Sequence, residues 1–306
     1  MSFFDNQILK CVGFIASKTV DGTFQLRGSV FFIGTADVPG EENLVGDLHW
    51  VTAKHVIEGI RRLGCESVFV RLNVMDGETR WVETKTSDWY SSKNNPASDI
   101  AILSHGFDET DDHVAIGPQF FLNEEIIDRL DLGVSDEVAV VGLFRHRAGR
   151  MRNIPIVRMG NVASFDHEDL INTQLGPAPI YLIEARSIGG LSGSPVFVGV
   201  GVRRSIFGKP KEGDKNFYLM GLIHGHYDVT EDAIDAFDAA GLSVEKVNTG
   251  IAMVTPFFRL TELIDEYKQH REALSRRRLF SIAPDTDSIL LTGPLSHLAS
   301  RPDKTD

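Results

Sequence analysis

The chain has few of the features that mark disulfide-rich or membrane proteins. Only two of its 306 residues are cysteines, Cys11 and Cys65, too few for the disulfide framework of a small secreted domain. No apolar run approaches the roughly 20 residues that cross a bilayer. The segment from Met1 to Gln7 also lacks the basic and apolar parts of a secretory signal. We therefore expect no membrane association and a cytoplasmic location.

An excess of positive charge is also missing. The 31 lysines and arginines are outnumbered by 43 aspartates and glutamates, which gives a formal net charge of −12. Nonspecific nucleic-acid binding depends on clustered Lys and Arg that neutralise phosphates. The composition therefore predicts no nucleic-acid partner, although it does not identify a substrate.

Helical periodicity is scarce before residue 256, and short runs of β-branched and aromatic residues recur between turn signals. The acidic stretch Asp108–Asp112 separates two groups of such runs and is interpreted as a linker. The pattern predicts one domain over 1–112 and a second over 113–277. The candidate strands are 7–17, 24–34, 48–52, 67–73, 81–85 and 99–103, then, after a further run at 114–121, 137–143, 155–165, 180–185, 195–200, 217–224 and 250–254.

The end of the chain differs from the rest. Apolar residues at helical spacing predict an amphipathic helix over about 256–277, with Thr255 and Pro256 as its cap and first-turn pair. A shorter helical pattern covers 57–63. Residues 278–306 contain Ser, Asp and Pro and a short apolar patch at Ile289–Leu291, so we expect a flexible tail that could dock a regulatory partner.

A serine framed by glycines stands in the middle of the chain. Residues 185–197 read Ala-Arg-Ser-Ile-Gly-Gly-Leu-Ser-Gly-Ser-Pro-Val-Phe, and glycines at these positions let backbone N–H groups turn toward the hydroxyl of Ser192. A serine needs a base to take its proton and a third group to orient that base. His55 follows the apolar run 50–53, and Asp99 directly precedes the apolar run 100–103. These residues predict a catalytic unit in the order His, Asp, Ser.

This order and these motifs resemble the chymotrypsin-fold serine peptidases over roughly residues 14–263. The run Thr-Ala-Lys-His-Val at 52–56 matches the family's Thr-Ala-x-His-Val, and Asp-Ile-Ala-Ile-Leu at 99–103 matches its aspartate strand. Bacterial-type trypsin-like peptidases look nearest. Glutamyl endopeptidases share Gly-Gly-x-Ser-Gly-Ser-Pro, and high-temperature-requirement proteases share the length of the loop before the serine.

The resemblance implies an all-β fold of two six-stranded antiparallel β-barrels with a C-terminal α-helix. It also implies a serine endopeptidase that acts on a protein or peptide substrate without a metal or an organic cofactor. Ser192 would be the nucleophile, His55 the general base and acid, and Asp99 the orienting carboxylate. The backbone N–H groups of Gly190 and Ser192 would form the oxyanion hole.

Four further residues suggest a pocket for an acidic side chain before the scissile bond. Arg186 and Ser187 precede the nucleophile at levels where relatives line the pocket, and His224 and His226 resemble the pocket histidine of glutamyl endopeptidases. Other interpretations stay open. Arg186 could be a surface charge or a partner of Glu184, His226 could be a loop residue, and His224 aligns only across a one-residue gap.

Each candidate has an ordinary structural interpretation when it is taken alone. His55 could be a strand-end histidine, Asp99 a turn residue and Ser192 a turn serine, with Ser194 as an alternative hydroxyl. Their agreement in order and spacing favours catalysis. A binding or scaffold protein of the same fold without turnover is the alternative. A cysteine nucleophile is excluded because that position holds serine, and the residue order does not fit an α/β-hydrolase.

Overall fold

Antiparallel strands rich in β-branched and aromatic residues build the first half of the chain, as their propensities favour. In the computed structural model, the described residues are 6–35, 47–166, 170–185, 190–201, 209, 211–226 and 250–282, with side chains described up to 273 except that of residue 226. Within these, the first sheet has the order β5-β4-β1-β2-β3-β6. Its strands are β1 (Val12–Lys18), β2 (Phe24–Gly34), β3 (Leu48–Thr52), β4 (Ser67–Asn73), β5 (Thr79–Lys85) and β6 (Ala101–Ser104).

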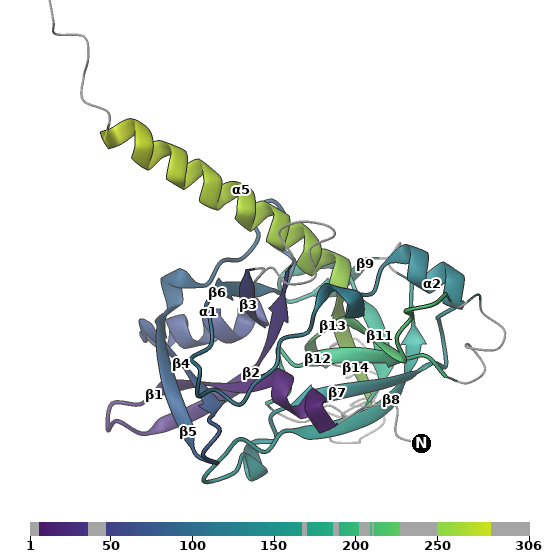
Figure 1. Cartoon of the computed structure of the whole chain (residues 1–306), viewed down its shortest axis with the longest axis horizontal. Coiled ribbons are helices and arrows are strands. Elements are labelled where there is room, and N and C mark those ends of the chain that lie inside the picture. The colour runs from purple at the N-terminus through teal and green to yellow at the C-terminus, as the bar shows by residue number, and fades with distance from the viewer. Residues whose placement is uncertain are drawn as a thin grey trace, which may run out of the picture. The chain divides into compact units, whose positions relative to one another are not determined.

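The second half closes into a barrel. In the described part of the chain, the strands follow the order β11-β14-β13-β12-β7-β8 around the barrel (Figure 1). They are β7 (Glu137–Gly142), β8 (Ile156–Ser164), β11 (Tyr181–Glu184), β12 (Pro195–Gly199), β13 (Phe217–His226) and β14 (Ile251–Pro256). The strands β9 (Leu170–Thr173) and β10 (Gly176–Pro179) form a separate hairpin.

Three α-helices accompany the strands in the described residues. α1 (Lys54–Arg62) follows β3 after a single residue, α2 (Glu124–Leu130) precedes the barrel, and α5 (Phe257–Ile282) directly follows β14. None of the described helices combines the length and the apolar composition that crossing a bilayer requires. Residues Met1–Tyr267 form one unit, and Lys268–Asp306 form a second.

The side chains of β12 alternate between two hydrophobic cores, so this strand contributes to both. Val196 and Val198 belong to the core inside the barrel, whereas Phe197 belongs to the larger core that also contains Trp50 and Leu72 of the first sheet. Successive side chains of a strand point to opposite faces, so one strand supplies both cores. The loop that precedes β12, which carries Ser192, is thereby held where the two sheets meet.

The predicted all-β fold with a closing C-terminal helix is confirmed, with a closed six-stranded barrel and a first sheet that forms half a barrel. This is the chymotrypsin-type arrangement. The division into domains at 112 and 113 stays a prediction, and the tail beyond 282 lies outside the described residues.

Several local predictions were wrong. Residues Asn6–Cys11 form a 3₁₀ turn rather than the start of a strand, because Ile8 and Cys11 are buried at its three-residue repeat. Residues 114–121 form isolated bridges and a 3₁₀ turn instead of a strand. α1 begins at Lys54 rather than at residue 57, and α5 extends past 277. α2 and the β9–β10 hairpin were not anticipated.

The acidic stretch that was interpreted as a linker is firmly held. The Asp111 carboxylate accepts two hydrogen bonds of 2.6 Å from the Arg80 guanidinium. Asp112 forms ion pairs with Lys10 at 2.6 Å and with Arg152 at 3.1 Å. Burial alone would raise the pKa of Asp111, but the hydrogen bonds from Arg80 and from the backbone of Asp108, together with the positive charge of Arg80, outweigh burial and lower that pKa. These ion pairs hold the segment to Lys10 and Arg80, which precede it in the chain, and to Arg152, which follows it.

Candidate active site

His55 lies in the first turn of α1, where its backbone and side chain both contact Asp99. The His55 backbone N–H donates to Oδ1 of Asp99 at 2.8 Å, and Nδ1 of its ring lies 2.7 Å from Oδ2. An ionised carboxylate only accepts, so Nδ1 carries the proton and Nε2 is left with a free lone pair. The ring is therefore oriented as a general base requires.

Asp99 itself is buried at the start of the segment that leads into β6. Its side chain has no exposed surface, whereas the His55 side chain is one-third exposed. Burial alone would lower the pKa of His55, but the hydrogen bond and the negative charge of Asp99 outweigh this effect and raise that pKa above its ordinary value. The partly exposed imidazole of His55 is therefore hydrogen-bonded to a buried carboxylate that makes it more basic.

The loop around Ser192 is fixed by hydrogen bonds to both sheets. Ser192 O accepts from the Ser29 N–H of β2 at 3.0 Å, and the Gly193 N–H donates to Ile223 O of β13 at 3.0 Å. Ser194 is fully buried, and its hydroxyl donates to the Ser29 hydroxyl at 3.0 Å. Ser194 is therefore closed off from a substrate, while Ser192 is partly exposed and lines a cleft.

Two glycines of this loop adopt left-handed backbone conformations. Gly190 has a φ of 113° and Gly193 a φ of 78°. The N–H groups of Gly193 and Ser194 are used within the loop and its neighbours. Among the described residues, no backbone acceptor takes the N–H of Gly190 or Ser192. Their assignment as oxyanion donors stays a prediction.

His224 lies beside the same buried carboxylate. Its Nδ1 is 3.3 Å from Oδ2 of Asp99, and its ring centroid is 6.1 Å from that of His55. The register of β13 shifts between Ile223 and Gly225, and such a bulge re-aims a side chain. Burial lowers the pKa of His224, Asp99 opposes this and His55 adds to it. The lowered pKa favours the uncharged form of His224 beside the His55–Asp99 pair.

The side chains of His55, His224 and Ser192 line one cleft of about 730 Å³. Sequence analysis missed two other parts of its wall. Arg62 lies seven residues after His55, and this spacing of two helical turns places both on one face of α1. Strand β9 and the turn that follows it also line the cleft, and the short strands of this hairpin gave no clear signal in the sequence. The lining residues are His55, Glu58, Arg62, Leu170–Leu175, Ser192, His224, Gly225 and Met253.

Three residues predicted for the substrate pocket cannot be placed in the cleft. Arg186 and Ser187 lie outside the described residues. The backbone of His226 pairs with Ala252 between β13 and β14, but its side chain is not among those described. Across the described residues, no group of three or more His, Cys, Asp or Glu side chains is arranged to hold a metal ion.

Comparisons with known proteins add little to this geometry. No protein-family model matches the chain. No curated protein matches it either. Among solved structures, it is similar to the crystal structure of Deg5, with 15% sequence identity and a TM-score of 0.43, over 84% of this chain and 90% of that chain.

We expect Gly193→Ala to disrupt the serine loop. A Cβ at this position would lie 2.4 Å from Thr52 Oγ1 and 2.6 Å from Ser29 O, in a backbone conformation that side chains disfavour. The free energy of unfolding should fall by about 1–3 kcal/mol in denaturant titration. Labelling of Ser192 by a serine-reactive fluorophosphonate should slow at least about 100-fold, as for a misplaced oxyanion loop. Gly106→Ala is the control, because a Cβ there meets nothing within 4 Å. Equal labelling of both variants would contradict this account of the loop.

Proposed function

We propose that the protein is a serine endopeptidase. The observation that carries the proposal is the pairing of His55 with the buried Asp99 through two hydrogen bonds, at the wall of the cleft that Ser192 also lines. A base whose tautomer is fixed by a carboxylate, in the same cleft as a glycine-framed serine, is the set of groups that acyl transfer needs.

The reaction would proceed in two stages. Nε2 of His55 takes the Ser192 proton while Oγ attacks the peptide carbonyl carbon, and the same proton then passes to the leaving amine as the C–N bond breaks. Water hydrolyses the resulting ester with His55 again as the base. Asp99 would stabilise the imidazolium that forms in each stage. The same hydrogen bond and negative charge raise the pKa of His55.

The negative charge on the carbonyl oxygen needs donors of its own. We propose the N–H groups of Gly190 and Ser192 for this role, since the adjacent N–H groups of Gly193 and Ser194 are already bonded within the protein. Removing one such donor typically costs about 100- to 1000-fold in turnover. The left-handed conformations of Gly190 and Gly193 support this assignment, because they turn the loop backbone sharply around Ser192.

We extend the proposal to a preference for an acidic side chain before the scissile bond. Two groups of the cleft support it. Arg62 brings a permanent positive charge, and His224 gains a second donor when a bound carboxylate raises its pKa. Without such a ligand His224 has a lowered pKa, so it does not by itself supply a positive charge. The proposed preference therefore depends more on Arg62, whose charge is constant, than on His224.

Proteome-wide cleavage profiling of wild type against Ser192→Ala tests both parts of the proposal. We expect new peptide termini with the wild type and none above background with the variant, and an excess of Glu and Asp directly before the cut. Cleavage only after basic or apolar residues would remove the acidic preference but leave the peptidase. If wild type and variant give the same termini, the protein is a binding or scaffold protein of this fold instead.

The pH dependence of hydrolysis tests the role of Asp99. Because His55 must be neutral to accept a proton, wild-type kcat should fall as the pH drops through a pKa above the ordinary histidine value. Asp99→Asn removes the two largest contributions that raise this pKa and leaves the burial that lowers it, so the acidic limb should move to lower pH. Its kcat should also fall by roughly 10⁴-fold through loss of the tautomer. An unmoved limb would show that Asp99 does not control His55.

A further inference from the structure

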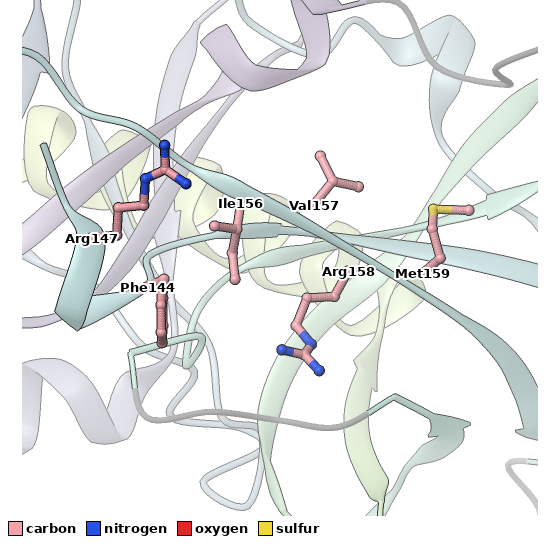
Figure 2. A pocket seen from close by; sticks show the side chains of 6 residues that line it. All are labelled: Phe144, Arg147, Ile156, Val157, Arg158 and Met159. Atoms are coloured by element: carbon pink, nitrogen blue, oxygen red, sulfur yellow. The ribbon is translucent and has the colours of Figure 1, made fainter.

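Two cavities in the described residues differ in the ligands that they suit. The one against β8 has a volume of about 500 Å³, and Figure 2 shows Arg158 pointing to the opposite side of the strand from Val157 and Met159. Its charged and apolar side chains therefore do not face one ligand. Neither His55 nor Ser192 lines it. The cleft of about 730 Å³ contains both of these residues and also every residue of β9.

The β9–β10 hairpin has two outer edges, because in the described part of the chain it is a sheet of two strands. The outer edge of β10 is blocked by Pro177 and Pro179, which have no N–H to donate. A proline fits an antiparallel pair only at a position that exchanges no hydrogen bonds with the partner strand. The partners of these prolines, Asn172 and Leu170, therefore also stand at non-bonded positions.

Consequently the backbone N–H and C=O groups of Leu170 and Asn172 point away from β10, along the outer edge of β9. In the part of the chain that the structure describes, no backbone group outside the hairpin bonds to them. The N–H and C=O groups of Ile171 and Thr173 point inward, toward β10. A strand edge with unpaired N–H and C=O groups is a template for one more strand.

This outer edge of β9 lies on the side of the cleft. All four β9 residues and the two turn residues that follow, Gln174 and Leu175, line the cleft, whereas no residue of β10 does. His55 and Ser192 line the same cleft. A chain that enters the cleft toward Ser192 therefore meets β9 rather than the strand that carries the prolines.

The hairpin is held in place by its own contacts. Ile171 and Ala178, one from each strand, pack in a small core with Met253 of β14. At the turn, the Thr173 hydroxyl donates to Gly176 O at 2.8 Å. An edge that is already formed costs a bound chain less ordering entropy than an unstructured segment would.

We propose that the outer edge of β9 binds an extended stretch of the substrate chain as a third strand. This proposal rests on the proposed peptidase function. The substrate backbone exchanges hydrogen bonds with Leu170 and Asn172, so this contact selects an extended conformation rather than particular side chains. The substrate is the favoured occupant because its chain must enter this cleft to reach Ser192. A second copy would have to bring its own strand edge into the cleft.

Amide hydrogen exchange of the inactive Ser192→Ala protein, measured residue by residue by NMR, tests the edge without turnover. The probe is the peptide Thr-Val-Thr-Val-Glu-Ser-Thr-Val-Thr-Lys, whose β-branched residues favour an extended backbone. Without the peptide, Ile171 and Thr173 should exchange slowly, and Leu170 and Asn172 quickly. A saturating concentration of the peptide should slow exchange at Leu170 and Asn172 at least about tenfold, because their N–H groups become hydrogen-bonded.

Two variants at one position separate the backbone from the side chain. Asn172→Pro removes the outward N–H and breaks no hydrogen bond to β10, whereas Asn172→Ala keeps the N–H and removes only the side chain. In the Ser192→Ala background, the proline variant should bind the fluorescein-labelled probe at least about fivefold more weakly than the alanine variant, by fluorescence anisotropy. Single N-methylation along the probe repeats the test on protein unchanged at Asn172. Methylation should weaken binding at alternate positions of the paired stretch.

The outcomes separate this edge from the catalytic proposal. Equal binding by the two variants, a probe insensitive to N-methylation, no binding at all, or unchanged exchange at Leu170 and Asn172 each overturns the edge. Slow exchange at these residues that appears without peptide as the protein concentration rises also overturns it, because the edge then pairs with a second copy. Cleavage of the probe by wild type without slowed exchange removes the edge and leaves the peptidase. Slowed exchange without any hydrolysis by wild type leaves the edge and removes the peptidase.

Discussion

The buried carboxylate of Asp99 is the constraint on which the site depends. A charge without exposed surface is stable only when it is paired and hydrogen-bonded. Here His55 satisfies it twice, through its backbone N–H and its ring, and His224 lies against the same oxygen as the ring of His55. The energetic need of the anion thus fixes the orientation of an imidazole that faces a cleft. The hydrogen bonds between His55 and Asp99 therefore both stabilise the buried charge and orient the base.

A second requirement is that two separately formed sheets meet at the serine loop. Ser29 of the first sheet bonds to the loop through its N–H and its hydroxyl, and the same hydroxyl accepts the N–H of Leu143 from the barrel side. Gly193 fits only because it lacks a side chain where Thr52 and Ser29 approach. The position of Ser192 relative to His55 therefore depends on packing across the junction, to which Phe197 of β12 contributes.

Much of this could be predicted from the sequence because the signals were local. The alternation of β-branched residues predicted most strands. The motifs also drew attention to His55 and Ser192, which line one cleft, and to Asp99, which pairs with His55, while their catalytic roles stay a prediction. The contact between His224 and Asp99 could not be predicted from the sequence, because it depends on a bulge in β13 and joins residues 125 positions apart. The β9–β10 hairpin was missed because its strands are only four residues each.

The central claim is that His55 and Ser192 act as one unit, and a double-mutant cycle tests it most directly. The rate of hydrolysis of one peptide is measured for wild type, His55→Ala, Ser192→Ala and the double variant. If the two residues act together, the double variant is about as slow as either single variant, because removing one already abolishes the shared step. If the two losses in rate multiply instead, the residues act independently and the account is contradicted.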